Sequence, residues 1–351
     1  MKVLVINSGS SSIKYKLFEM PGEHLVLKGM IEHIAEKGSK VKDHYSGLEI
    51  ILKKIPMVSA VGHRVVHGAE EFKRPVLIDK KVIKKIKQCS LIAPLHNPAN
   101  LAGILACKAL LPKVRQAAIF DTAFHQTIPD YAYIYGLAYS YYKDYGIRKY
   151  GFHGSSHEYV SAEAARRLKK PIKRLKIITC HLGNGCSITA INKGRSVDTS
   201  MGFTPLEGLI MGTRSGDIDP ALVTYIMRKK KIDTSAMEEI LNKESGLKGI
   251  SGISNDMRVL EKKASKGDLR AKLAIDIFVY RIRKYIGAYC AIMGGCDALV
   301  FTAGIGENQK KVRERICRGL FGHLKFAPRV FVIPTDEELL IARKTYKLIK
   351  S

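Results

Sequence analysis

Two segments of the chain share a pattern in which an apolar, β-branched run enters a turn rich in Gly, Ser and Asn. The first spans residues 2–18 with its turn at 7–12, and the second spans residues 177–191 with its turn at 182–186. Both patterns predict β-hairpins with polar tips, where backbone N–H groups can turn towards an anion. One Gly-rich tip has a purely conformational explanation. Two similar hairpins indicate a duplicated domain with one phosphate-binding hairpin in each copy.

A third segment predicts a strand at Ala298–Thr302, a polar turn at 303–308 and a charged helix from about Gln309. The beginning of such a helix can face a nucleotide phosphate. Asn97 with Pro98, and Ser155 with Glu158 as a capping box, mark the starts of two further helices. Helical periodicity is found at 97–111, 155–169, 220–230 and 268–293. Alternating strands and helices predict an α/β architecture.

Length and composition indicate a globular protein of about two domains, at roughly 150 residues each. The chain has 351 residues, of which 46% are hydrophobic, and the pattern breaks in the Tyr-rich stretch 122–150, where we expect a domain boundary. No apolar run reaches the ~20 residues of a membrane span, and no signal peptide is recognisable. The seven cysteines are scattered without a CxxC pair, which favours reduced thiols and a cytoplasmic location.

The strongest compositional bias is a formal net charge of +27. Such a charge suggests nucleic acid as a partner. However, the basic residues lie in short runs mixed with apolar residues at helical spacing, which is typical of solvated helix faces. Interleaved aromatic residues are missing from these runs, and the chain has no Trp. We therefore expect no specific nucleic acid and no membrane as partner, but a general attraction for small anions.

Two arginines occupy unusual positions. Arg64 lies within the apolar run 61–68, and Arg214 lies between Gly212 and Gly216 ahead of a predicted helix. A buried arginine needs a partner, so Arg64 is either paired in the core or an anion clamp. Together, two such guanidinium groups could neutralise the oxygens of a phosphoryl group in transfer.

Other candidate side chains lie at the ends of predicted elements. Asp121 follows the apolar run 117–120, where it could contact a ligand or metal, or simply cap the next turn. His96 and His153 directly precede predicted helix starts, which favours a neutral imidazole able to donate one hydrogen bond to a phosphoryl oxygen. Lys14 follows the first turn, but no Walker A motif surrounds it.

Several motifs, taken in order, closely resemble the signature segments of the acetate kinases, the acetokinase family of short-chain acyl kinases. They lie at residues 7–14, 62–68, 120–126, 151–157, 181–185, 198–219, 301–308 and 334–339. The resemblance implies two duplicated α/β domains of the acetate and sugar kinase, Hsp70 and actin fold, which is ribonuclease H-like. It also implies an N-terminal acyl-kinase domain of residues 1–125 plus 338–351, and a C-terminal nucleotide-binding domain of residues 126–337.

The same resemblance implies roles for individual residues. Arg64 and Arg214 would clamp acetate and the phosphoryl group, Asp121 would position or activate the acetate carboxylate, and His153 would donate a hydrogen bond to the phosphoryl group. The substrate pocket would be formed by Val66, Leu95, His96, Phe152 and Pro205.

For the nucleotide, ATP or ADP, the resemblance implies residues from all three Gly-rich segments and from the stretch 256–258. They are Ser10, Ser12, Lys14, His181, Asn184, Gly185, Asp256, Met257, Arg258, Gly304, Gly306 and Asn308. Asn7 and Glu337 would help to hold Mg²⁺, or Mn²⁺ in its place, and Glu338 competes with Glu337 for this role. The family also implies a homodimer.

The implied reaction is in-line attack of acetate on the γ-phosphoryl group of ATP, giving acetyl phosphate and ADP reversibly. A carboxylate is already deprotonated at neutral pH, so its attack needs no general base. Propionate or butyrate kinase is the nearest alternative, because one methylene is worth only about 1–3 kcal/mol of discrimination. An Hsp70-like ATPase and a nucleic-acid-binding protein are more distant alternatives.

Overall fold

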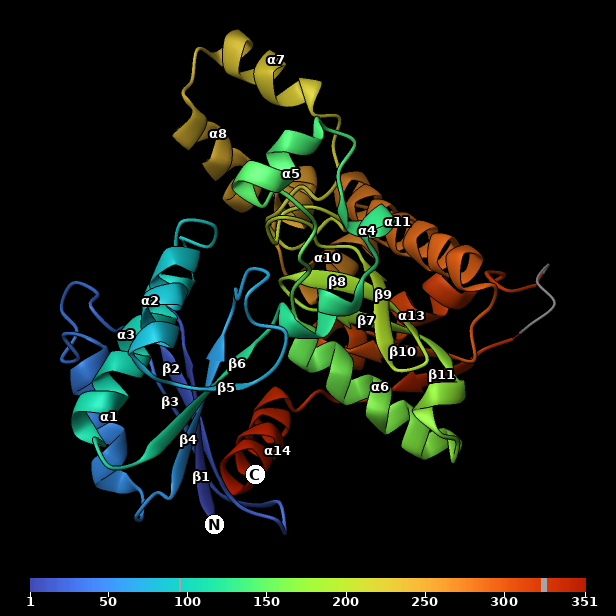
Figure 1. Ribbon diagram of the computed structural model, residues 1–351. Coiled ribbons are helices and arrows are strands. Elements are labelled where there is room, and N and C mark those ends of the chain that lie inside the picture. The colour runs from blue at the N-terminus through green and yellow to red at the C-terminus, as the bar shows by residue number, and fades with distance from the viewer. Residues whose placement is uncertain (95, 323–326) are drawn as a thin grey trace. The chain divides into compact units, whose positions relative to one another are not determined.

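The computed structural model of the protein describes residues 1–94, 96–322 and 327–351 (Figure 1). The chain divides into two compact units: unit 1 comprises residues 1–126 and 336–351, and unit 2 comprises residues 127–335. Among the described residues, no helix is both long and apolar enough to cross a bilayer.

Unit 1 is built on a mixed six-stranded sheet with the order β3-β2-β1-β4-β6-β5. Its strands are β1 (Lys2–Ser8), β2 (Ile13–Glu19), β3 (His24–Ile31), β4 (Ala60–Val65), β5 (Val76–Leu77) and β6 (Arg115–Phe120). Its helices are α1 (His44–Lys54), α2 (Lys80–Cys89), α3 (Asn97–Leu110) and α14 (Glu337–Lys350). A short 3₁₀ turn over Ala123–Thr127 ends at the first residue of unit 2.

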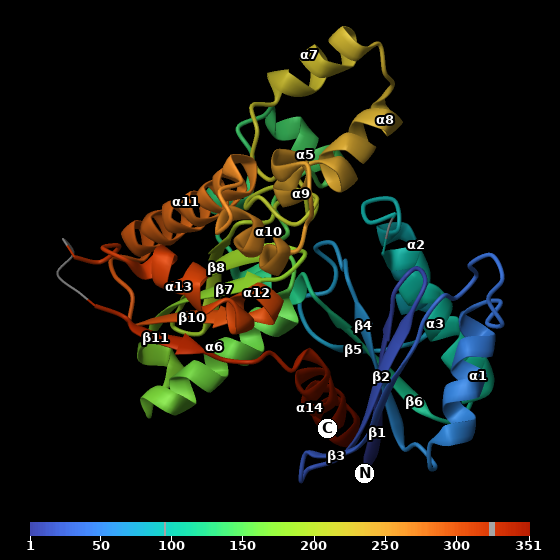
Figure 2. The ribbon, with the colours of Figure 1, turned by 180° about the vertical axis from the view of Figure 1, so that it is seen from behind.

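Alternation along β1 divides the core of unit 1 into two layers. Leu4 and Ile6 are buried together with residues of α1 and α3, whereas Val3 and Val5 face the apolar side of α14. Helix α14 lies against the sheet in Figures 1 and 2, although it is the last element of the chain. A Cβ at Gly62 of β4 would come within 2.3 Å of Thr345 Oγ1, so the close approach of α14 requires glycine at this position.

Unit 2 is built on a five-stranded sheet with the order β11-β10-β7-β8-β9. Its strands are β7 (Lys176–Leu182), β8 (Cys186–Asn192), β9 (Arg195–Thr199), β10 (Ala298–Thr302) and β11 (Arg329–Val332). Its helices are α4 (Asp130–Tyr133), α5 (Tyr139–Tyr145), α6 (Gly154–Leu168), α7 (Ala221–Lys230), α8 (Thr234–Glu239), α9 (Gly246–Ser251), α10 (Met257–Ala264), α11 (Leu269–Met293), α12 (Ala303–Asn308) and α13 (Lys310–Cys317). A 3₁₀ turn over Ile172–Arg174 and a π-helical turn over Ile240–Glu244 complete it.

The two sheets share one plan. In each, an antiparallel meander (β1-β2-β3, β7-β8-β9) continues on its other side into parallel strands (β4 and β6, β10 and β11). The predicted hairpins at residues 2–18 and 177–191 are the first two strands of these meanders. The duplication inferred from their similar tips is therefore present as a duplicated sheet topology.

Two predicted helix starts differ in detail from the structure. Helix α6 begins at Gly154, after His153 in a left-handed conformation with φ of 56°, and no capping side-chain hydrogen bond is present. The predicted capping box of Ser155 and Glu158 is therefore wrong, because both residues already lie within the helix. Asn97 likewise does not cap α3; its amide side chain bonds to both the N–H and the C=O of His67.

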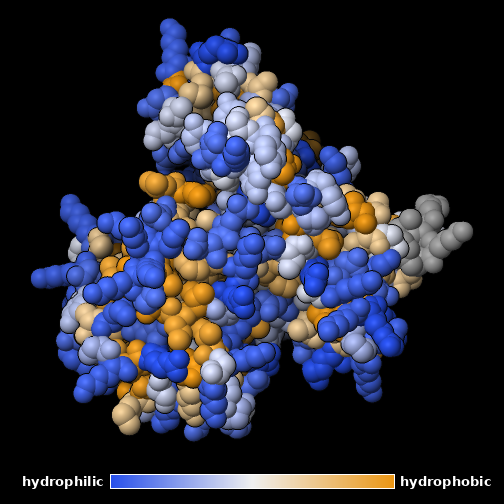
Figure 3. All heavy atoms as spheres, viewed as in Figure 1, coloured by the Kyte–Doolittle hydropathy of each residue, from blue (hydrophilic) through white to orange (hydrophobic). Residues whose placement is uncertain are grey.

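The basic runs lie on solvated helix faces, as their spacing predicts. In α2, Lys80, Lys81, Lys84 and Lys85 are exposed while Ile86 is fully buried. Hydrophilic residues cover much of the face drawn in Figure 3, with smaller apolar areas between them.

Candidate active site

Arg64 and Asp121 face each other across two neighbouring parallel strands of unit 1. Arg64 lies on β4, and Asp121 follows β6, where its backbone N–H donates to the carbonyl of Val65 at 2.9 Å. The Arg64 Nε donates to Asp121 Oδ1 at 3.1 Å and its Nη2 to Oδ2 at 2.5 Å. This bidentate ion pair fixes the plane of the guanidinium group.

The same guanidinium group also contacts Glu337 and Asn7. Arg64 Nε lies 3.3 Å from Glu337 Oε2, and Nη1 donates to Asn7 Oδ1 at 3.4 Å. Burial raises the pKa of the Glu337 carboxyl to about 7; Arg64 opposes this rise, while Asp121 and Glu338 reinforce it. Burial also disfavours the charged form of Arg64, but Asp121 and Glu337 outweigh it and hold its pKa above the usual range.

Asn7 and Glu337 offer oxygen atoms of the kind that hard divalent cations prefer. Burial disfavours the charged form of the Glu337 carboxyl, and a cation beside it would, like Arg64, favour that charged form. Within the described ranges, no cluster of three His, Cys, Asp or Glu side chains is arranged to hold a metal. The donors therefore suit an ion whose remaining ligands are water and phosphate, as is common for Mg²⁺.

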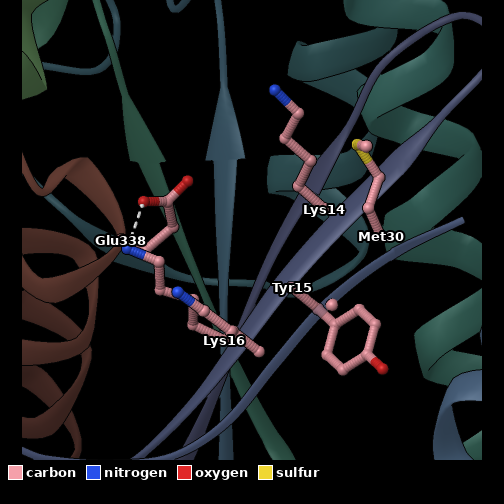
Figure 4. A pocket seen from close by; sticks show the side chains of 7 residues that line it. Lys14, Tyr15, Lys16, Met30 and Glu338 are labelled. Carbon is pink, nitrogen blue, oxygen red and sulfur yellow. Dashed lines mark ion pairs between the residues drawn. The ribbon is translucent and has the colours of Figure 1, made fainter.

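Glu338, the competing candidate, lies in different surroundings. Its carboxylate pairs with Lys16 at 3.1 Å, and Lys16 also pairs with Asp336 at 2.8 Å. Figure 4 shows the pair of Lys16 and Glu338, which with Lys14 lines a cavity of about 340 Å³. Glu337 is thus the one of the two glutamates that contacts Arg64.

The first hairpin carries the three predicted nucleotide-binding residues of unit 1. Its tip is a tight turn, in which the N–H of Gly9 donates to the carbonyl of Ser12 at 2.7 Å. Ser10 is exposed, Ser12 is half-buried, and Lys14 is exposed at the cavity drawn in Figure 4.

The predicted substrate-pocket residues belong to both units. In unit 1, Val66 is half-buried, and its N–H donates to Asn100 Oδ1 at 2.9 Å. His96 is the residue that precedes α3, and Leu95 lies outside the described residues. In unit 2, Phe152 is buried, and the carbonyl of Pro205 accepts a hydrogen bond from Arg214.

Arg214 and His153 converge within unit 2 at Gly185, which precedes β8. The point that a Cβ of Gly185 would occupy lies 3.5 Å from both Arg214 Nη1 and His153 Nε2. Within the part of the chain that the structure describes, no carboxylate pairs with Arg214, whose Nη1 donates only to Pro205 O and Met211 Sδ. Burial lowers the pKa of its guanidinium group. A mostly buried cation without a carboxylate is suited to binding an anion.

The ring of His153 is held from two sides. Its Nδ1 lies 2.9 Å from Ser187 Oγ, and its plane stacks on the ring of His181 with 4.1 Å between centroids. His181 Nδ1 in turn bonds to Ser156 Oγ at 2.8 Å. The other nitrogen, Nε2, and the adjacent Cε1 both lie 3.5 Å from the Cβ position of Gly185.

A cavity of about 460 Å³ in unit 2 collects residues from the second hairpin, α10 and α12. Of the predicted nucleotide-binding residues, it is lined by Asn184, Asp256, Met257, Arg258, Gly304 and Asn308. His181, Gly185 and Gly306 do not line it. The sequence reasoning missed Asn255, whose Nδ2 donates to Asn184 Oδ1 at 3.0 Å, although it directly precedes the predicted stretch 256–258.

Comparisons with known proteins identify the family of the chain. The model of the acetokinase family matches residues 2–327. Acetate kinases of Treponema denticola and Halothermothrix orenii are 50% and 49% identical to the chain, with all of each chain covered. The first alignment spans 397 positions, more than the 351 residues of this chain, so that relative contains segments with no counterpart here.

Solved structures give the same result. The Porphyromonas gingivalis acetate kinase is 42% identical, with a TM-score of 0.93 and 99% of each chain covered. A propionate kinase from Francisella tularensis is 41% identical, with a TM-score of 0.92 and 99% of each chain covered. A ROK family protein from Streptococcus pneumoniae, 11% identical with a TM-score of 0.52 over 100% of this chain and 99% of its own, shares the fold alone. The predicted fold class and family resemblance are confirmed: the chain belongs to the acetokinase family.

Proposed function

We propose that the protein is an acetate kinase, which transfers the γ-phosphoryl group of ATP reversibly to acetate and forms acetyl phosphate and ADP. The observation that carries this proposal is the convergence of Arg214 and His153 at Gly185, in a chain about 50% identical to acetate kinases over its full length. Arg214 supplies a cation that has no carboxylate partner among the described residues, and His153 supplies an imidazole nitrogen near the same point.

The geometry of each unit supports the proposed roles. In unit 1, Arg64 would bind the acetate carboxylate, while Asp121 keeps its guanidinium group in one plane. In unit 2, Arg214 and His153 would bind the oxygens of the phosphoryl group. Catalysis then consists of orientation and charge neutralisation, because the carboxylate is already a nucleophile.

Kinases of this family use ATP or ADP together with a divalent metal, and we propose Mg²⁺, with Mn²⁺ as a substitute. Asn7 and Glu337 would hold the ion, which when bound neutralises charge on the nucleotide phosphates. The nucleotide would occupy the cavity lined by Asn184, Asp256 and Gly304. The predicted residues Ser10, Ser12 and Lys14 of the first hairpin would bind its phosphates.

Propionate remains a second candidate acceptor, because a propionate kinase is 41% identical to this chain. Half-buried Val66 and buried Phe152 would set the volume available for the acyl chain. A comparison of kcat/KM for acetate, propionate and butyrate decides between them. We expect acetate to give the highest value; a higher value for propionate would reassign the acceptor.

The activity itself is tested by trapping the acyl phosphate as its hydroxamate. Purified protein, ATP, acetate and Mg²⁺ should yield acetyl hydroxamate, and the yield should collapse when Mg²⁺ is chelated. Failure to form an acyl phosphate with any short carboxylic acid would refute the kinase assignment.

We also propose that the protein is a homodimer, which light scattering can test. We further propose a cytoplasmic location, which suits the seven free cysteines.

A further inference from the structure

Three buried polar side chains form a continuous row of hydrogen bonds that ends at His153. The proposed phosphoryl transfer assigns them no role. Thr179 Oγ1 lies 2.7 Å from His157 Nδ1, and His157 Nε2 lies 2.7 Å from Ser187 Oγ. Ser187 Oγ in turn lies 2.9 Å from His153 Nδ1. Thr179, His157 and Ser187 are fully buried, in β7, α6 and β8 of unit 2.

The proton count of this row leaves two orders for neutral histidines. Ser187 has a single hydroxyl proton, so it donates to one of its two histidines and accepts from the other. If it donates to His153, that ring carries its proton on Nε2, and His157 must accept from Thr179. If it donates to His157, every bond reverses, and His153 carries its proton on Nδ1.

Thr179 decides between the two orders. In the part of the chain that the structure describes, His157 Nδ1 is the only hydrogen-bond partner of Thr179 Oγ1. In the reversed order, Thr179 would accept from His157, and its own proton would be buried without an acceptor. A buried donor left unsatisfied is destabilising, so the order that begins at the Thr179 hydroxyl is favoured.

We propose that Thr179, His157 and Ser187 are positioning residues that form a one-way chain of hydrogen bonds and hold the proton of His153 on Nε2. This nitrogen lies 3.5 Å from the Cβ position of Gly185, and Arg214 Nη1 lies at the same distance from that point. Only a protonated Nε2 can donate to a phosphoryl oxygen; a bare Nε2 would present a lone pair and repel it. The inference deepens the proposed phosphoryl transfer and rests on it for its catalytic consequence, but not for the proton positions.

The proton positions can be read directly by NMR. In long-range ¹H–¹⁵N spectra of protein labelled with ¹⁵N-histidine, we expect both His153 and His157 as Nε2–H tautomers, assigned with His153→Gln and His157→Gln. In Thr179→Val, which removes the first donor, both rings should become tautomer mixtures. Thr179→Ser, which restores the hydroxyl, should return the wild-type spectrum. A wild-type spectrum with the His153 proton on Nδ1 would overturn the proposal, whether or not any variant folds.

Kinetics supply the second readout. We expect Thr179→Val to lower kcat about tenfold, the equivalent of one buried hydrogen bond, with KM for ATP and acetate unchanged. Thr179→Ser should restore kcat. Thr189→Val is a matched control, because it removes a buried hydroxyl that bonds to Thr199 instead of a histidine. Wild-type kcat in Thr179→Val would count against the proposal, whereas absence of acyl phosphate with the wild-type protein would refute the proposed function and leave the tautomer result standing.

Discussion

His153 Nε2 and Arg214 Nη1 lie at the same distance, 3.5 Å, from the position that a Cβ of Gly185 would take. An imidazole nitrogen and a cation thus border the space that a side chain at residue 185 would fill. A guanidinium group and an imidazole nitrogen at this point suit a phosphoryl oxygen rather than an apolar group.

Filling this space should inhibit the reaction without unfolding the protein. The backbone of Gly185 does not need a positive φ, and contacts of 3.5 Å are ordinary van der Waals contacts. We therefore expect Gly185→Ala to lower kcat about 10–100-fold, because its methyl group displaces the phosphoryl group, with an unchanged Tm. Gly287→Ala, where a Cβ meets nothing within 4 Å, serves as the control substitution. Full activity in Gly185→Ala would mean that the phosphoryl group binds elsewhere.

Removing Arg64 should abolish most of the turnover. The side chain supplies a planar fork held by both oxygens of Asp121, which neither Ala nor Lys can reproduce. We expect Arg64→Ala to lower kcat by about 10³ or more, and Arg64→Lys to recover only part of the loss. Steady-state kinetics of both variants, with exposed Arg166→Ala as control, would check this. Near wild-type turnover in Arg64→Ala would exclude Arg64 from the chemistry.

Replacing Arg214 should raise the stability of the protein and lower its activity. Its guanidinium group is mostly buried without a carboxylate partner among the described residues, and burial lowers its pKa. Arg214→Met removes this buried charge, so we expect the free energy of unfolding to rise by about 0.5–2 kcal/mol. The kcat should fall by about 10³. Urea unfolding and kinetics on the same sample measure both effects; a variant that loses stability as well would indicate a structural role.

Glu337 and Glu338 can be separated by their metal dependence. Glu337 contacts Arg64, whereas Glu338 pairs with Lys16. We expect Glu337→Gln to raise the Mg²⁺ concentration needed for half-maximal activity by about tenfold or more, and Glu338→Gln to change it little. Mn²⁺ binding followed by electron paramagnetic resonance provides a readout independent of turnover. The opposite ranking of the two variants would move the metal site to Glu338.

Sequence patterns correctly predicted those helices and strands whose ends are marked by their own residues. Asp268 caps α11 through the N–H of Ala271, and the strand at Ala298–Thr302 has the bounds that its apolar run indicated. The edge strand β3 was not predicted, because its exposed Leu25, Val26 and Met30 do not alternate with polar residues. Local pattern alone could not reveal such a strand, whose pairing with β2 gives it its structure.

The site was less accessible to sequence reasoning because its contacts are non-local. The ion pair of Arg64 with Asp121 depends on the parallel register of β4 and β6, in which Val65 lies opposite Phe120. The sequence marks Arg64 as a charge within one apolar run and Asp121 as a charge at the end of another. It does not indicate that the two residues pair. The bonds from Thr179 through His157 to Ser187 join three elements and leave no motif in the sequence.

The stability of unit 1 should fall in mild acid because His63 is buried as a neutral ring. Its Nε2 bonds to Gln116 Oε1 at 2.9 Å, and burial lowers its pKa from 6.5 to about 4, although the bond to Gln116 opposes this shift. Between these pH values the unfolded chain takes up a proton that the folded chain does not. The free energy of unfolding therefore falls as the pH decreases from about 6.5 to 4, by about 1.4 kcal/mol per pH unit for this group.

His63→Gln cannot take up that proton in either state, so its stability should depend less steeply on pH in this range. Burial also lowers the pKa of His67 to about 4, so the variant should keep the part of the slope that His67 contributes. Urea unfolding at closely spaced pH values measures both slopes, and exposed His24→Gln is the control. Equal slopes for the wild type and His63→Gln would show that His63 is protonated in the folded protein, and that Gln116 accepts from an imidazolium ion.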